Sequence, residues 1–222
     1  MLSCRGVGRT YQTDRGPVDA VRGIDLDVST GRYAAVIGRS GSGKSTLMAM
    51  IGGLSRPTAG SILIDGADIW SLSDNARARF RNRRIGYVFQ FASLLPTLRA
   101  IDNVALPARL DRRSANADTY YRAAELLTEL GIGSHYDAYP SEMSAGEQRR
   151  TVIARALIND PILLLADEPT SDLDVETESE IMALLLNVNR ECGTTLILVT
   201  HNLALASEAA QVVQIADGVI VP

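Results

Sequence analysis

Residues 38–45 constrain this chain more than any other stretch. They read Gly-Arg-Ser-Gly-Ser-Gly-Lys-Ser and match G-x-x-x-x-G-K-[S/T] at every fixed position. The five residues before them, 33–37, are apolar throughout, as in a strand that is buried on both faces of a sheet. A helix is expected to begin near Lys44. Buried strand, glycine-rich loop and helix in this order predict an α/β fold with a phosphate-binding loop.

Three later apolar runs, at residues 85–89, 162–166 and 196–199, resemble the first strand, and a helical pattern separates the last two. They predict a mostly parallel core sheet with helices on both faces. Short alternating runs near the N-terminus and at 61–64 indicate an antiparallel β lobe. We find no repeat or linker and expect one domain. Its expected parts are the core and β lobe, about 1–91 and 159–222, and a helical lobe, about 92–158, together covering 1–222.

The phosphate loop is expected to bind a nucleoside triphosphate. Its glycines let backbone N–H groups approach phosphate oxygens closely, and the helix start adds partial positive charge. Lys44 should reach the β- and γ-phosphates, Ser45 should bind Mg²⁺, and Thr46 should contact the α-phosphate. The alternative is a plain Gly/Ser turn, which the Lys-Ser pair and the flanking elements disfavour. The expected nucleotide contacts in this stretch are Gly38, Arg39, Ser40, Gly41, Ser42, Gly43, Lys44, Ser45 and Thr46.

Two carboxylates, Asp167 and Glu168, end the apolar run at 162–166. Ligands of open α/β sheets bind at the carboxyl ends of strands, so both acids should lie beside the phosphates. Asp167 is the better partner for Mg²⁺. Glu168 is placed to activate the attacking water as a general base. A solvated acidic turn is the other interpretation, and the nearby phosphate loop disfavours it.

Two more polar residues follow apolar runs. His201 comes after the run that ends at Val199-Thr200, and Gln90 ends the run at 85–89. Both should therefore reach the same edge of the sheet. We expect His201 near the γ-phosphate and Gln90 at Mg²⁺ or the attacking water. A lone histidine is more often structural, and His135, in a polar segment, is given no role.

The composition excludes several classes of protein. The net charge of −4 and the absence of a long basic run argue against a nucleic-acid partner. Cys4 and Cys192 are far apart and indicate neither a disulfide framework nor a metal site. The N-terminus does not read as a secretory signal, and no run of about 18 apolar residues predicts a membrane span. If the protein drives transport, another chain must supply the pore.

Residues 144–147, Ser-Ala-Gly-Glu, form a capping box that opens a helix. They also resemble the signature of ABC ATPases, usually L-S-G-G-Q. With the phosphate loop, Gln90, Asp167-Glu168 and His201 in the right order, essentially the whole chain resembles an ABC ATPase. Met143 and Ala145 depart from the usual Leu and Gly, and a helix start tolerates Ala. The stretches that resemble the lipoprotein-releasing and macrolide-exporter branch (LolD/MacB-like) are residues 52–54, 87–90, 94–96, 102–107 and 166–170.

The resemblance implies the P-loop NTPase fold of ABC ATPases and a head-to-tail dimer of two copies closed around two MgATP. Ser144 and Gly146 would contact the γ-phosphate held by the opposite copy. Tyr11 stands at the position of the residue that stacks on adenine in this family. Asp174 lies in the stretch that matches the loop crossing the dimer interface. Asp172 departs from the small or neutral residue common there and adds a negative charge.

The function implied is ATP hydrolysis that drives export or extraction through transmembrane permease subunits. The protein would be cytoplasmic, peripheral on the inner face of the cell membrane. An importer ATPase and a non-transport ABC ATPase that transmits force to a membrane partner during cell division remain alternatives. DNA-repair ATPases carry long insertions that do not fit here, and P-loop kinases or GTPases lack the signature helix.

Four apolar side chains follow Gln90 closely: Phe91, Leu94, Leu95 and Leu98. This is more apolar surface than a solvent loop needs. Some of them are expected to line a groove for a short cytoplasmic helix of the membrane subunit. The alternative is that all four belong to the core of the helical lobe. Full burial of every one of them would contradict the groove.

Overall fold

The computed structural model describes residues 1–111 and 117–221. Its larger sheet has six strands within these residues, in the order β10-β9-β3-β8-β7-β6. Neighbouring strands from β9 to β6 are parallel, and β10 pairs antiparallel with β9 at the edge. This confirms the mostly parallel core sheet. The strands are β3 (Tyr33–Ile37), β6 (Ile85–Val88), β7 (Leu163–Asp167), β8 (Thr195–Val199), β9 (Gln211–Ala216) and β10 (Val219–Val221).

The central strands are apolar on both faces because the sheet separates two cores. In β3, Ala35 packs into the core that holds α3 to α6, whereas Ala34 and Val36 pack into the core that holds α1 and the second sheet. Residues of β7 and β8 alternate in the same way. Successive side chains of a strand point to opposite faces, so a continuous apolar run is what this position in the fold requires.

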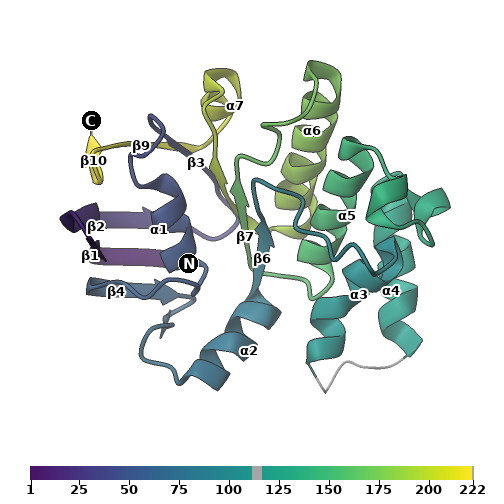
Figure 1. Ribbon diagram of the computed structural model, residues 1–222, viewed down its shortest axis with the longest axis horizontal. Helices are drawn as coiled ribbons and strands as arrows, with labels where there is room; N and C mark the ends of the chain where they lie inside the picture. Colours follow the sequence, from purple (N-terminus) through teal and green to yellow (C-terminus); the bar gives the residue numbers. More distant parts are fainter. Residues whose placement is uncertain (112–116, 222) are drawn as a thin grey trace.

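The second sheet is an antiparallel lobe beside the core (Figure 1), with the strand order β2-β1-β4-β5. Strands β1 and β2 pair along most of their length, from Leu2 opposite Val28 to Thr13 opposite Gly16, with bulges between. Ile24 is buried, and the polar residue after it, Asp25, is exposed. This alternation is the one the sequence predicted for a half-buried strand. The strands are β1 (Leu2–Thr13), β2 (Gly16–Val28), β4 (Ala59–Ile64) and β5 (Ala67–Asp68).

Helices cover both faces of the core sheet, and α3, α4 and α5 gather on the side away from the antiparallel lobe (Figure 1). Helix α4 stops before Gly131, whose φ of 77° is left-handed. None of the helices in the described residues combines the length with the apolar character that a membrane-spanning helix needs. The helices are α1 (Lys44–Ile51), α2 (Asp74–Arg84), α3 (Ala100–Leu110), α4 (Ala117–Glu129), α5 (Ala145–Leu157), α6 (Val175–Cys192) and α7 (Leu203–Ser207), with short 3₁₀ helices at Gly133–His135 and Pro140–Glu142.

Asn103 in α3 holds the loop that leads into this helix. Its side chain is fully buried. Its Oδ1 accepts a hydrogen bond from the N–H of Leu95 at 2.8 Å, and its Nδ2 donates to the carbonyls of Leu95, Leu98 and Arg99. One amide therefore satisfies backbone groups that the loop cannot pair by itself.

Asn103→Ala should lower the free energy of unfolding by about 1–3 kcal/mol, because it leaves buried backbone groups without partners. Asn75→Ala is the matched control, since Asn75 is exposed on α2, and it should change stability by less than about 0.5 kcal/mol. Chemical denaturation of the two variants and the wild type measures both effects. Equal stabilities would contradict the role given to Asn103.

Candidate active site

The phosphate loop joins β3 to α1 and lies in close contact with the backbones of β9 and β2. A Cβ on Gly38 would lie 2.2 Å from the carbonyl oxygen of Ile215, and one on Gly43 would lie 2.3 Å from that of Ala20. Gly43 also has a left-handed φ of 105°. Glycine is therefore required at both positions by close approach. The N–H of Gly218 donates to the carbonyl of Ser42 at 3.0 Å, which ties the loop to the β9–β10 turn.

Lys44, the chain's single lysine, lies over this loop. It is only 6% exposed, and its Nζ donates to the carbonyls of Gly38 at 2.9 Å and Arg39 at 3.0 Å. The hydroxyl of Ser42 is buried and has no hydrogen-bond partner among the described residues. Ser45 and Thr46 belong to the first turn of α1, where N–H groups lack helical partners. Arg39, Ser40 and Gly41 are exposed.

Asp167 ends β7 beside this helix start. It is 9% exposed, and burial is the main cause that raises the pKa of its carboxyl above the ordinary value. A hydrogen bond with Ser45 and the charge of Lys44 act in the opposite direction, and the Glu168 carboxylate adds to the rise. A buried carboxylate and a hydroxyl at the mouth of a phosphate loop are oxygen donors of the kind Mg²⁺ prefers.

Glu168, the next residue, has an unusual backbone. Its φ of 44° is left-handed, and its N–H donates to the carbonyl of Val199 on β8 at 3.0 Å. This turn carries the Glu168 carboxylate out of the sheet, where its Oε2 lies 3.5 Å from Nε2 of Gln90 and 3.9 Å from Nδ1 of His201. Gln90, Glu168 and His201 lie in separate parts of the sequence. Their side chains nevertheless come together at one edge of the sheet.

Glu178 is a residue of this region that the sequence did not reveal. Its Oε1 accepts a hydrogen bond from the Thr170 hydroxyl at 3.1 Å and from Nδ2 of Asn202 at 3.2 Å. It thereby joins the loop after β7, which carries Glu168, to the loop after β8, which carries His201. In sequence Glu178 is one of several acids at the start of α6, and no local signal separates it from the others.

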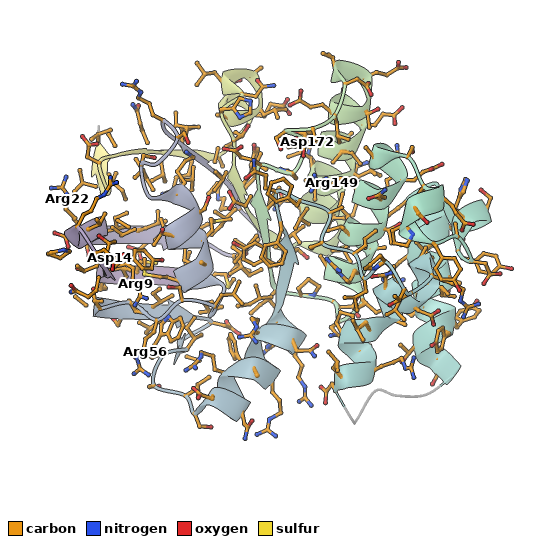
Figure 2. The ribbon with its side chains drawn as sticks, in the orientation of Figure 1. Arg9, Asp14, Arg22, Arg56, Arg149 and Asp172 are labelled. Atoms are coloured by element: carbon orange, nitrogen blue, oxygen red, sulfur yellow. The ribbon has the colours of Figure 1, made fainter. Side chains whose placement is uncertain are left out.

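Tyr11 lies on β1, 36% exposed, with the guanidinium of Arg9 stacked 4.6 Å from its ring centroid. Figure 2 shows Arg9 on the antiparallel lobe, where its Nη1 donates to the carbonyl of Arg56. Burial alone would raise the pKa of Tyr11, but hydrogen bonding with Ser55, Thr46 and Arg9 and the charge of Arg9 lower it. Thr46, one of these groups, belongs to the first turn of α1, and the stacking role of Tyr11 stays a prediction.

The signature segment begins α5 as the capping box predicts. The Ser144 hydroxyl accepts a hydrogen bond from the N–H of Glu147 at 3.3 Å, and the Glu147 carboxylate accepts from the N–H of Ser144 at 2.7 Å. Hydrogen bonds from the Ser144 N–H and hydroxyl hold the pKa of Glu147 below its ordinary value. A Cβ on Gly146 would lie 2.9 Å from Cγ2 of Thr177, so a side chain at this position would require Thr177 on α6 to shift.

Asp174 caps that neighbouring helix. Its Oδ1 accepts from the N–H of Thr177 at 2.9 Å and its Oδ2 from the Thr177 hydroxyl at 2.8 Å. The starts of α5 and α6 are thus packed together on one side of the core sheet, whereas α1 lies on the other side. The structure therefore brings Lys44, Asp167, Glu168, Gln90 and His201 to one edge, and places Ser144 and Gly146 on a different lobe.

Comparison with known proteins agrees with this geometry. The family described as ABC transporter matches residues 21–171. The chain is 45% identical to the lipoprotein-releasing system ATP-binding protein LolD 2 of Caulobacter vibrioides, over 98% of this chain and 95% of that protein. It is 44% identical, over its whole length, to the macrolide export ATP-binding/permease protein MacB of Syntrophobacter fumaroxidans, but it spans only 31% of that longer protein.

A solved structure with the same fold is the ATP-binding cassette MJ0796, described as a dimer in a post-hydrolysis state bound to ADP and Pi. It is 35% identical, has a TM-score of 0.93, and is matched over 100% of this chain and 97% of that one. The sequence matches, the shared fold and the phosphate loop with its two carboxylates lead to one conclusion. The chain belongs to the ABC transporter family.

Proposed function

We propose that this chain binds and hydrolyses ATP as one of two identical subunits of a transport system that exports or extracts its substrate. The observation that carries the proposal is the meeting of the phosphate loop, Asp167, Glu168, Gln90 and His201 at one edge of the core sheet. No single one of these residues would support ATP hydrolysis alone, and together they supply a phosphate cradle, oxygen ligands and a base.

The phosphate loop would hold the triphosphate from Gly38 to Thr46. Lys44 would exchange its bonds with the Gly38 and Arg39 carbonyls for phosphate oxygens, and the buried Ser42 hydroxyl would gain a partner. Ser45, Asp167 and the Gln90 side-chain oxygen would hold Mg²⁺, which, when bound, neutralises charge on the β- and γ-phosphates. Tyr11, backed by Arg9, would stack on adenine.

Glu168 would take a proton from the attacking water as that water bonds to the γ-phosphorus and ADP leaves. Gln90 and His201 flank the Glu168 carboxylate and would orient the water and the γ-phosphate. The left-handed backbone at Glu168 supports this role, since strained conformations persist where the position of a side chain matters.

Dimerisation would complete the site. Ser144 and Gly146 begin α5 on the opposite side of the sheet from α1, so a second copy, arranged head to tail, is proposed to bring them to the γ-phosphate. Helix starts attract anions through free N–H groups and the helix dipole. Asp174, at the start of α6 beside them, would lie in the same interface.

A membrane partner would be engaged near Gln90, from the cytoplasmic face of the membrane. Phe91 is 71% exposed and Leu95 is 44% exposed, whereas Leu94 packs against the helical-lobe core and Leu98 is partly buried. An adjoining groove of about 360 Å³ runs between α2, β6, α3 and α5, with Phe89 and Pro107 among its lining residues. These exposed apolar groups support docking of a cytoplasmic segment of a permease subunit.

The transport role has two competitors: an importer ATPase, and an ABC ATPase that transmits force to a membrane partner without moving a substrate. Purification of the chain with its membrane partner from the native membrane separates them. A multi-span partner with a large extracytoplasmic domain, and substrate-stimulated hydrolysis, would favour the exporter. A partner that couples hydrolysis to a cell-wall enzyme would favour the second competitor.

Lys44→Ala should abolish ATP binding, because it removes the cation placed to meet the β/γ-phosphate charge. Nucleotide titration measures the loss. Since Lys44 is the single lysine, an amine-reactive reagent followed by peptide mapping reports on this one lysine side chain. MgATP should protect Lys44 of the wild type from the reagent. Arg32→Ala, an exposed cation outside the loop, is the control and should bind ATP normally. Unimpaired binding by Lys44→Ala would refute the phosphate-loop assignment.

Glu168→Gln should lower hydrolysis by about 10²–10⁴-fold, the usual contribution of a general base, while ATP binding survives. ATP should then hold the two subunits together, because ligand that bridges the dimer favours that state. Size-exclusion chromatography with and without MgATP tests for this dimer. Glu191→Gln, an exposed acid at the far end of α6, is the control. Undiminished hydrolysis would remove Glu168 from its role, and retained binding without an ATP-dependent dimer would count against the composite site.

A further inference from the structure

Helix α5 is hydrogen-bonded to the loop that carries Gln90. Arg149 lies on the second turn of α5 and is only 3% exposed. Its Nη1 donates to the carbonyl of Phe89 at 2.6 Å and its Nη2 to the carbonyl of Gln90 at 2.7 Å. A planar guanidinium can bond two successive carbonyls at once, which a lysine ammonium cannot do with the same geometry.

A second arginine of α5 holds the next part of the same loop. Arg155 donates through Nη1 to the Ser93 carbonyl at 2.9 Å and through Nη2 to the Ser93 hydroxyl at 2.9 Å. Burial lowers the pKa of both Arg149 and Arg155. Residues 89–93 are therefore attached to α5 at two points, one of which is the backbone of Gln90 itself.

Asp172 lies in the loop between Glu168 and α6, and its charge favours the protonated guanidinium of Arg149, whose pKa burial lowers.

We propose that Arg149 is a positioning residue that fixes the Gln90 backbone to α5. The Gln90 amide then stays beside the Glu168 carboxylate, and any rotation of the helical lobe carries Gln90 with it. The loop after β6 and the signature helix thus meet at a single buried guanidinium. The kinetic part of this proposal rests on the proposed ATPase activity, and the hydrogen-exchange part below does not.

The kinetic test compares Arg149→Gln with Arg150→Gln, the neighbouring arginine of α5, which instead bonds the Leu130 carbonyl and Glu180. Misplacing a catalytic group by about 1 Å can cost about 10²-fold in rate, so kcat of Arg149→Gln should fall by about 10-fold or more. The KM for ATP should stay within about twofold, since Lys44 and Ser45 are untouched. Arg149→Lys should restore kcat only partly. A fall in kcat no larger than that of Arg150→Gln, or full restoration by lysine, would overturn the proposal.

Hydrogen exchange of the ligand-free protein gives a readout that does not depend on hydrolysis. Arg149→Gln should speed exchange in the peptide that spans residues 89–93, and Arg150→Gln should not. If the wild type hydrolyses no ATP, the proposed function fails and this measurement still decides the role of Arg149. Unchanged exchange in residues 89–93 would overturn the attachment, as would a rise that is spread evenly over the chain and so reports general destabilisation.

Discussion

The fold depends on the close approach of three backbone segments, which are the phosphate loop, β2 and the β9–β10 hairpin. No side chains lie between them at the points of contact. The phosphate loop passes between β2 and the β9–β10 hairpin so closely that a Cβ on Gly38 or Gly43 would overlap a carbonyl oxygen. Hydrogen bonds from Gly218 to Ser42 and from Arg22 to Gly218 close the arrangement. Figure 2 shows Arg22 at the outer edge of the antiparallel lobe, far from the helical lobe. The antiparallel lobe, the loop and the end of the core sheet are therefore joined by direct backbone contacts, and the candidate nucleotide site is built upon them.

The other half of the site is assembled differently. Gln90 belongs to a loop that α5 holds through Arg149 and Arg155, so its position follows the helical lobe as much as the sheet. Glu168 and His201 leave adjacent parallel strands, and Glu178 joins their loops. One wall of the site is thus joined to the antiparallel lobe and the end of the core sheet, and the other is attached to a separate group of helices. A site divided in this way can change shape when the two groups move relative to each other.

Much of this could be predicted from the sequence, for identifiable reasons. The strands β3, β7 and β8 were evident because a short, continuous apolar run between turn residues is typical of a strand buried on both faces, and α5 because its capping box is local. Parallel topology then placed Asp167, Glu168 and His201 at one edge. Arg149, Asn103 and Glu178 were missed because their partners are distant backbone or loop groups, and a buried polar contact leaves no periodic pattern. The roles of individual site residues remain predictions until the variants are measured.

The left-handed backbone of Glu168 has a consequence for how this position responds to selection. A non-glycine residue in that region costs on the order of 1–3 kcal/mol, and glycine would occupy it without strain. A library screened only for heat resistance should therefore enrich glycine at position 168, whereas a screen for growth that depends on the working protein should reject it. The two pressures oppose each other at one residue, so stabilisation of this enzyme by directed evolution must begin elsewhere in the chain.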